Sequence, residues 1–102
     1  MAYSHLGNYP EAINQYRQAR EIFKEEKMVT EVGQCDLHIA EANFESGNTI
    51  EAIAAGKKAV DVAWFTYGDD MHARSHLVLV KSYLALGELE AATPHLVDAQ
   101  AL

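Results

Sequence analysis

A short phrase recurs along this chain at a spacing of forty residues, and this repetition constrains the fold more than any other feature. The copies begin at Gly7, Gly47 and Gly87, and in each copy an alanine follows five residues after the glycine. Glycine readily takes the positive φ that closes a helix, so each phrase is typical of a turn between two helices. A phrase that returns at a fixed period of roughly 20–50 residues indicates stacked helical units. We therefore expect an internal repeat built from helices.

The segments between these phrases have the periodicity of amphipathic helices. The first stripe of apolar residues, spaced by three and four, consists of Ala12, Ile13, Tyr16, Ala19, Ile22 and Phe23. The helices expected from such stripes cover about residues 8–28, 30–46, 48–63, 70–86 and 89–102. Pro94 should loosen the first turns of the last one. No segment alternates with a period of two, so no strand is expected.

Polar residues at the starts of these segments are expected to cap the helices. Asn8 and Asn48 each precede a glutamate by three residues, which is the spacing of a capping box. Thr30 and Asp70 stand where two further helices would begin. The sequence thus predicts an all-α fold, an antiparallel helix-pair solenoid of about two and a half repeats. It would form one domain over residues 1–102, divided into a partial repeat 1–28, a repeat 29–68 and a repeat 69–102.

Charge and composition argue against several classes of partner. The 102 residues include fifteen acidic and eight basic side chains, a net charge of −7. Nucleic acids and anionic membranes bind clustered Lys and Arg, so neither is expected as a partner. The longest apolar run, Leu77–Val80, is far shorter than a membrane span, and no signal-peptide pattern opens the chain. Cys35 is the single cysteine and indicates a reducing compartment, so we expect a cytoplasmic protein.

The basic residues of the first third of the chain are interleaved with glutamates. These cations are Arg17, Arg20, Lys24 and Lys27. At helical spacing we expect them to form i,i+4 pairs on a solvated face rather than a basic patch.

The spacing of Gly7, Tyr9, Ala12, Tyr16 and Ala19 resembles the second half of a tetratricopeptide repeat. The forty-residue period is similar to the longer repeats of kinesin-light-chain-type arrays. The aromatic positions differ in the later copies, which have Thr49 and Gly56, then Leu89 and Leu96. Asp36 and His76 stand where the family has an early Trp. The resemblance implies a right-handed superhelix that acts as a non-catalytic protein-binding scaffold.

The resemblance also implies a concave groove lined by the first helix of each repeat. Its expected lining is Gln34, Leu37, His38, Glu41, Phe44, Arg74, Leu77, Val78, Lys81 and Leu84. Arg74 and Lys81 would pair with an acidic or C-terminal carboxylate group of a bound peptide or protein segment. The alternative for each position is an ordinary solvated or helix-packing side chain.

The first repeat lacks most of its first helix, so its core would be partly uncovered. Either the chain is a piece of a longer array, or a partner supplies the missing packing. The apolar side chains expected at such open ends are Tyr16, Ile22, Phe23, Leu96 and Leu102. Burying each would contribute about 1.5–3 kcal/mol. We therefore expect a homo-oligomer, most simply a dimer, and a self-assembly module is the alternative function.

Two small groups of residues are candidates for a metal site or a catalytic site. His72 and His76 are separated by four residues, with Asp69 and Asp70 upstream, a spacing that two zinc ligands on one helix would need. The alternative is that Asp70 caps the helix and His76 packs between helices. Because no further ligand is evident, we expect neither a metal nor another cofactor.

Cys35 lies three residues before His38, where a nucleophile and a base would be neighbours on one helix. Such a pair on one helix more often consists of packing residues, and no phosphate-binding loop or Ser-His-Asp set is present, so we do not expect an enzyme. Trp64, Phe65 and Tyr67 form an aromatic cluster. It would either pack against the next helix or offer a contact patch to a partner.

Overall fold

The computed structural model describes residues 8–63 and 69–88, and these residues are almost entirely helical. The four helices are α2 (Tyr9–Glu25), α3 (Val29–Glu45), α4 (Thr49–Ala63) and α5 (Asp69–Ala85). The described ranges contain no strand. The expected all-α class is thereby confirmed.

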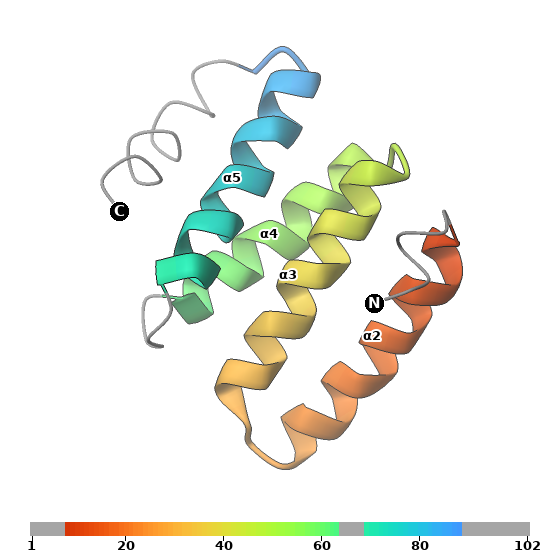
Figure 1. The fold of residues 1–102 in the computed structure, drawn as a ribbon, viewed down its shortest axis with the longest axis vertical. Coiled ribbons are helices and arrows are strands. Elements are labelled where there is room, and N and C mark those ends of the chain that lie inside the picture. The colour runs from red at the N-terminus through yellow and green to blue at the C-terminus, as the bar shows by residue number, and fades with distance from the viewer. Residues whose placement is uncertain (1–7, 64–68, 89–102) are drawn as a thin grey trace.

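The helix bounds repeat at the spacing found in the sequence. α4 begins forty residues after α2, and α5 both begins and ends forty residues after α3. Consecutive helices run antiparallel, and α3 lies between α2 and α5 (Figure 1). α3 contacts each of the other three helices, so it is the central element of the described fold.

The three described turns share one backbone conformation. Lys27, Gly47 and Gly87 have φ values of 59°, 92° and 77°. In each turn the next residue's N–H donates to the carbonyl five residues before it: Met28 to Phe23 at 2.9 Å, Asn48 to Asn43 and Glu88 to Tyr83 at 2.8 Å. This is the Schellman motif, which glycine forms without strain. The prediction that Gly47 and Gly87 end helices is confirmed, whereas Lys27 takes the same conformation despite its side chain.

The expected capping residues are corrected by the structure. Thr30 and Asp70 lie inside α3 and α5, because each helix starts before them. Met28 occupies the cap position of α3, and Asn8 caps α2 by position only, without a side-chain hydrogen bond. The Asn48 amide donates to Asn43 and Ser46 of the preceding helix. Backbone hydrogen bonds of the turns at Gly47 and Gly87 satisfy carbonyls at the ends of α3 and α5.

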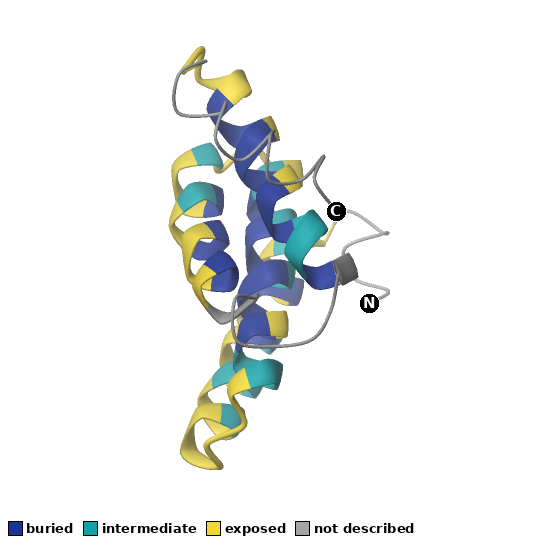
Figure 2. Ribbon diagram, turned by 90° about the vertical axis from the view of Figure 1, so that its left-hand side faces the viewer, coloured by how far each residue is buried: buried dark blue, intermediate teal, exposed yellow. Residues whose placement is uncertain are grey.

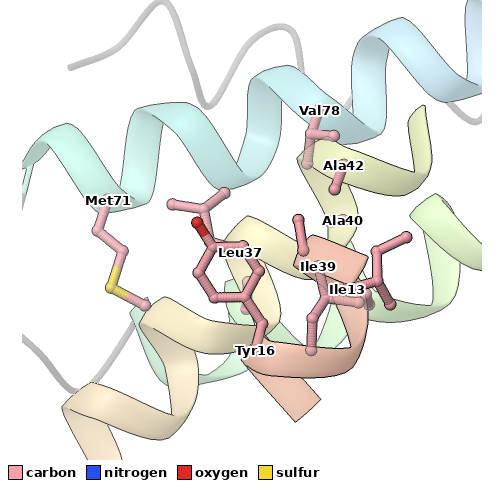
Figure 3. Close-up of a cluster of buried hydrophobic side chains, with 11 residues drawn as sticks. Ile13, Tyr16, Leu37, Ile39, Ala40, Ala42, Met71 and Val78 are labelled. Atoms are coloured by element: carbon pink, nitrogen blue, oxygen red, sulfur yellow. The ribbon is translucent and has the colours of Figure 1, made fainter. Parts of the chain in front are cut away.

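Small residues let the helices approach closely around a shared core. Ala12, Ala40, Ala52 and Ala59 are at most 1% exposed. Figure 3 shows the main cluster, which gathers Ile13 and Tyr16 of α2, several residues of α3 that include Leu37, and Met71 and Val78 of α5. Burial follows the sides on which helices meet, while outer edges and turns are exposed (Figure 2).

Gly56 is a second point of close approach, between α4 and α5. A Cβ atom built on Gly56 would lie 2.9 Å from Leu79 Cδ2 and 3.3 Å from Val78 Cγ1. Leu79 is completely buried, so a side chain at position 56 would force the side chains of Leu79 and Val78 to shift within the contact between α4 and α5.

Candidate functional site

The helices α3 and α5 contact each other along one side of the fold, which carries charged and apolar side chains. We call this side the α3–α5 face. An ion pair crosses it, since Arg74 Nη2 lies 2.6 Å from Glu41 Oε1 and Arg74 Nε lies 3.2 Å from Glu41 Oε2. His38 Nδ1 lies 3.7 Å from Glu41 Oε1 on the same helix. The two-pronged geometry fixes Arg74 against α3.

A shallow cavity of about 90 Å³ opens beside this ion pair. Its lining consists of Glu41, Phe44, Glu45, Arg74, Leu77, Val78 and Lys81. Lys81 Nζ lies 5.9 Å from the centre of the Phe44 ring, at the outer limit of a cation–π contact. Leu77 and Leu84 are 45% and 49% exposed, so the face offers apolar surface as well as charge.

The electrostatics of the face are set by Glu41. Burial would raise the pKa of this carboxyl, but the contact with His38 and the hydrogen bonds and charge of Arg74 outweigh it and hold the pKa below its usual range. Glu41 is therefore ionised at neutral pH and neutralises Arg74. The expectation that Arg74 awaits a partner's carboxylate is thus corrected, because the chain already supplies one.

Six of the ten predicted groove residues line this one cavity: Glu41, Phe44, Arg74, Leu77, Val78 and Lys81. Gln34 and Leu84 are exposed, and His38 is partly exposed. Leu37 and Val78 are corrected, because both belong to the buried core, with Leu37 only 2% exposed. Leu37 supports the face from below, and Val78 contributes only to the floor of the cavity.

The residues expected to mediate self-association differ in their exposure in the structure. Ile22 is 61% exposed and Phe23 is partly buried. Tyr16 is corrected: it is 9% exposed, and its ring stacks on His38 at a centroid distance of 4.9 Å. Leu96 and Leu102 lie outside the described residues, as does the Trp64, Phe65 and Tyr67 cluster.

A larger depression, between α2 and α4 over α3, was not anticipated. Two adjoining cavities of about 270 and 500 Å³ share Arg17, Asn43 and Glu51. Arg20 and Asp36 line the first, with Arg20 Nε 2.7 Å from Asp36 Oδ1. The expectation that Arg20 pairs with a glutamate on its own helix is therefore wrong for its shortest contact, which is with Asp36 of α3. The available signal was Asp36 itself, a charge within the buried stripe of a helix, which requires a cation nearby.

Burial raises the pKa of Asp36, and the hydrogen bond and charge of Arg20 counteract this only in part. The two interhelical ion pairs thus differ in character. Glu41 is stabilised as a carboxylate, whereas Asp36 is held in an environment that penalises its charge.

The candidates for chemistry have packing roles in the described part of the chain. His72 Nε2 lies 3.1 Å from His76 Nε2 with the rings nearly perpendicular, which fits a hydrogen bond between imidazoles. No group of three potential metal ligands exists among the described residues, and the Asp69 and Asp70 side chains lie outside them. Cys35 is buried, and burial raises the pKa of its thiol, which disfavours the thiolate needed for nucleophilic attack.

No protein-family model, curated protein or solved structure matches this chain. Within residues 8–63 and 69–88, none of the helices has the length and apolar character that crossing a membrane requires.

Proposed function

We propose that this chain is a non-catalytic protein-interaction module, a helical-repeat array of the tetratricopeptide type with about two and a half repeats. Three observations support the repeat: helix bounds forty residues apart, the shared turn motif, and buried alanines at Ala12 and Ala52. A single buried thiol fits a reducing compartment such as the cytoplasm.

The binding surface in this proposal is the α3–α5 face, and its ligand is a peptide or a segment of a protein. The observation that carries it is the exposure of Leu77 and Leu84, which stand two helical turns apart on one side of α5 beside the cavity at Phe44. Large exposed apolar side chains grouped around a hollow, with charges at the rim, are typical of protein-binding surfaces. A rigid helical platform would bind with little cost of reorganisation.

A peptide display library panned against the full chain tests this proposal. Selected peptides should lose at least about tenfold in affinity to a Leu77→Asp, Leu84→Asp double variant, because a charge there opposes apolar contact. The matched control is Ile50→Asp, an equally apolar and exposed position on α4 away from the face. Circular dichroism verifies that each variant is folded. Equal loss in the control, or no loss in the double variant, contradicts the proposal.

Self-association is the alternative function, and a separate group of exposed residues favours it. Ile22, Met28 and Val29, near the turn between α2 and α3, are 61%, 41% and 56% exposed. If this group forms a contact between copies, sedimentation velocity at tens of micromolar will show a dimer that Ile22→Glu dissociates. A wild-type monomer under these conditions rejects the alternative.

A further inference from the structure

Two equivalent stripes, one on α3 and one on α5, differ in what covers them. We define the α3 stripe as Gly33, Leu37, Glu41 and Phe44, and the α5 stripe as Ala73, Leu77, Lys81 and Leu84. Each member of the second follows its counterpart by forty residues. The spacings of four, four and three place each set on one side of its helix.

The α3 stripe is covered by α5. Leu37 is 2% exposed, and Glu41 receives the two hydrogen bonds of Arg74 from α5. Val78, one turn further along α5, lies in the same buried cluster as Leu37. The chain thus contains its own example of a helix docked on this stripe: apolar residues pack at its centre, and an ion pair at its edge sets the register.

The α5 stripe has the same spacing, but its apolar members are more exposed. Leu77 and Leu84 are 45% and 49% exposed, whereas their counterparts Leu37 and Phe44 are buried and partly buried. The charge is reversed, because Lys81 stands at the position of Glu41. Lys81 contacts only the Phe44 ring in the described structure, at 5.9 Å, so a carboxylate can capture it at little cost.

We propose that the α5 stripe docks an amphipathic helix of a partner protein, packed as α5 packs on α3, and that this helix carries Asp or Glu where α5 carries Arg74. The docked helix covers Leu77 and Leu84, and its carboxylate pairs with Lys81. This inference rests on the proposed function and specifies the partner's secondary structure and its charge.

A second copy of the chain is a poorer occupant. The helix of a copy that packed in the same manner would be α3 or α5, and these carry Gln34 and Arg74 at the pairing position. Gln34 supplies no charge, and Arg74 would place a cation opposite Lys81. The net charge of −7 on each copy adds general repulsion. Charge complementarity therefore favours a different chain with an acidic residue at this position.

The test uses two probe peptides with the sequence of residues 69–85, one native and one carrying Arg74→Glu. Both are made helical by a side-chain bridge on the side away from the Arg74 position. Each is titrated by fluorescence anisotropy into the full chain, into its Lys81→Glu variant and into its Leu77→Asp variant. Circular dichroism confirms that the three proteins are folded.

The acidic peptide should bind the wild-type chain about fivefold more tightly than the native peptide, as expected for a partly exposed ion pair. The order should reverse with Lys81→Glu, and both peptides should bind Leu77→Asp at least about tenfold more weakly. Added salt should reduce the charge-dependent difference.

Three outcomes overturn the inference: no binding of either peptide to wild type, no reversal with Lys81→Glu, or self-association of the wild-type chain that Leu77→Asp abolishes. The last would assign the stripe to a second copy. Failure here leaves the proposed function standing if display-selected peptides still depend on Leu77 and Leu84, so the two proposals fail separately.

Discussion

The helix pairs α2–α3 and α4–α5 have nearly the same bounds forty residues apart but are held together by different contacts. In α2–α3 the Tyr16 ring stacks on His38. The equivalent positions in α4–α5 are Gly56 and Val78, and there the two helices pack directly on one another. The two rings of α2–α3 thus correspond to a glycine and a valine in α4–α5.

The buried polar residues of the two helix pairs also differ, together with the residues that they contact. Asp36 and His76 are equivalent and both are buried. Asp36 binds Arg20 of the neighbouring helix at 2.7 Å, whereas the residue equivalent to Arg20 is the buried Val60. His76 contacts His72 on its own helix instead. The side chains at the helix contacts thus differ between the two pairs, while the buried alanines Ala12 and Ala52 stand at equivalent positions in both.

Among substitutions at positions that differ between the two helix pairs, removing the aromatic stack should lower stability the most. Tyr16→Gly copies Gly56 into α2 without the matching change at His38, so it leaves a cavity and weakens the helix. We expect a loss of about 4–5 kcal/mol in the free energy of unfolding, measured by urea denaturation. Tyr16→Phe, which keeps the ring, is the control and should change stability by less than about 1 kcal/mol. Similar losses in both variants would mean that the ring stack is not the important contact.

The two stripes predict unequal costs for the same substitution. Leu37→Ala removes a buried side chain and should cost about 3 kcal/mol. Leu77→Ala, at the equivalent exposed position, should cost less than about 1 kcal/mol. Thermal denaturation of both variants gives the difference directly. Equal costs would show that Leu77 is covered in solution.

The buried ion pair of α2–α3 should contribute with a characteristic pH dependence. Asp36→Asn removes the buried charge that pairs with Arg20 and should cost about 2 kcal/mol at neutral pH. Because burial raises the pKa of Asp36 despite Arg20, the folded chain binds the proton more readily than the unfolded chain. Wild type should therefore gain stability relative to Asp36→Asn as pH falls through that raised pKa. Urea denaturation at a series of pH values checks the sign.

A methyl group at Gly56 should test the close approach of α4 and α5. Gly56→Ala places Cβ against Leu79 and Val78, but alanine is also the better helix former by about 1 kcal/mol. Crowding should win, with a net loss of about 1 kcal/mol by urea denaturation. A net gain in stability would show that the Leu79 and Val78 side chains adjust at little cost and that the contact between α4 and α5 has room for a methyl group.

The ion pair between α3 and α5 should have the smallest effect and the opposite pH dependence. Glu41→Gln should cost about 0.5–1 kcal/mol, since the pair is partly exposed. The pKa of Glu41 is lowered in the fold, so its contribution is present above the unfolded pKa and is lost as pH falls through the folded pKa. The difference between wild type and Glu41→Gln should thus shrink in acid. A difference that grows in acid would contradict the assigned environment of Glu41.

The helices were predictable because the forty-residue phrase and the apolar spacing are local features. Gly47 and Gly87 end helices as expected, and the four described helices agree with the expected ranges to within a few residues. The helix expected over residues 89–102 lies outside the described residues. The exact starts of α3 and α5 were not predictable, because Thr30 and Asp70 suit a cap chemically but each helix begins one residue earlier. Cap preference is a weak effect that turn geometry overrides.

The site was predictable only as a set of helix faces. Spacing grouped Glu41 with Phe44 and Arg74 with Lys81, and the structure brings all four to one cavity. Which of these charges is already used could not be foreseen, since the Glu41–Arg74 and Arg20–Asp36 pairs join residues 33 and 16 positions apart. Pairing over such distances depends on how helices stack, and local periodicity does not contain that information.

The rate at which a thiol reagent modifies the buried Cys35 can report how often α3 opens. The chain has one cysteine, so a thiol reagent can attach at only one place. Its thiol is 5% exposed, and burial raises its pKa, so the closed fold reacts slowly. Modification then proceeds through transient openings in which α3 moves away from its neighbours, and its rate reports how often these occur. A ligand that binds across α3 and α5 will slow this reaction even when it leaves the spectrum of the helices unchanged.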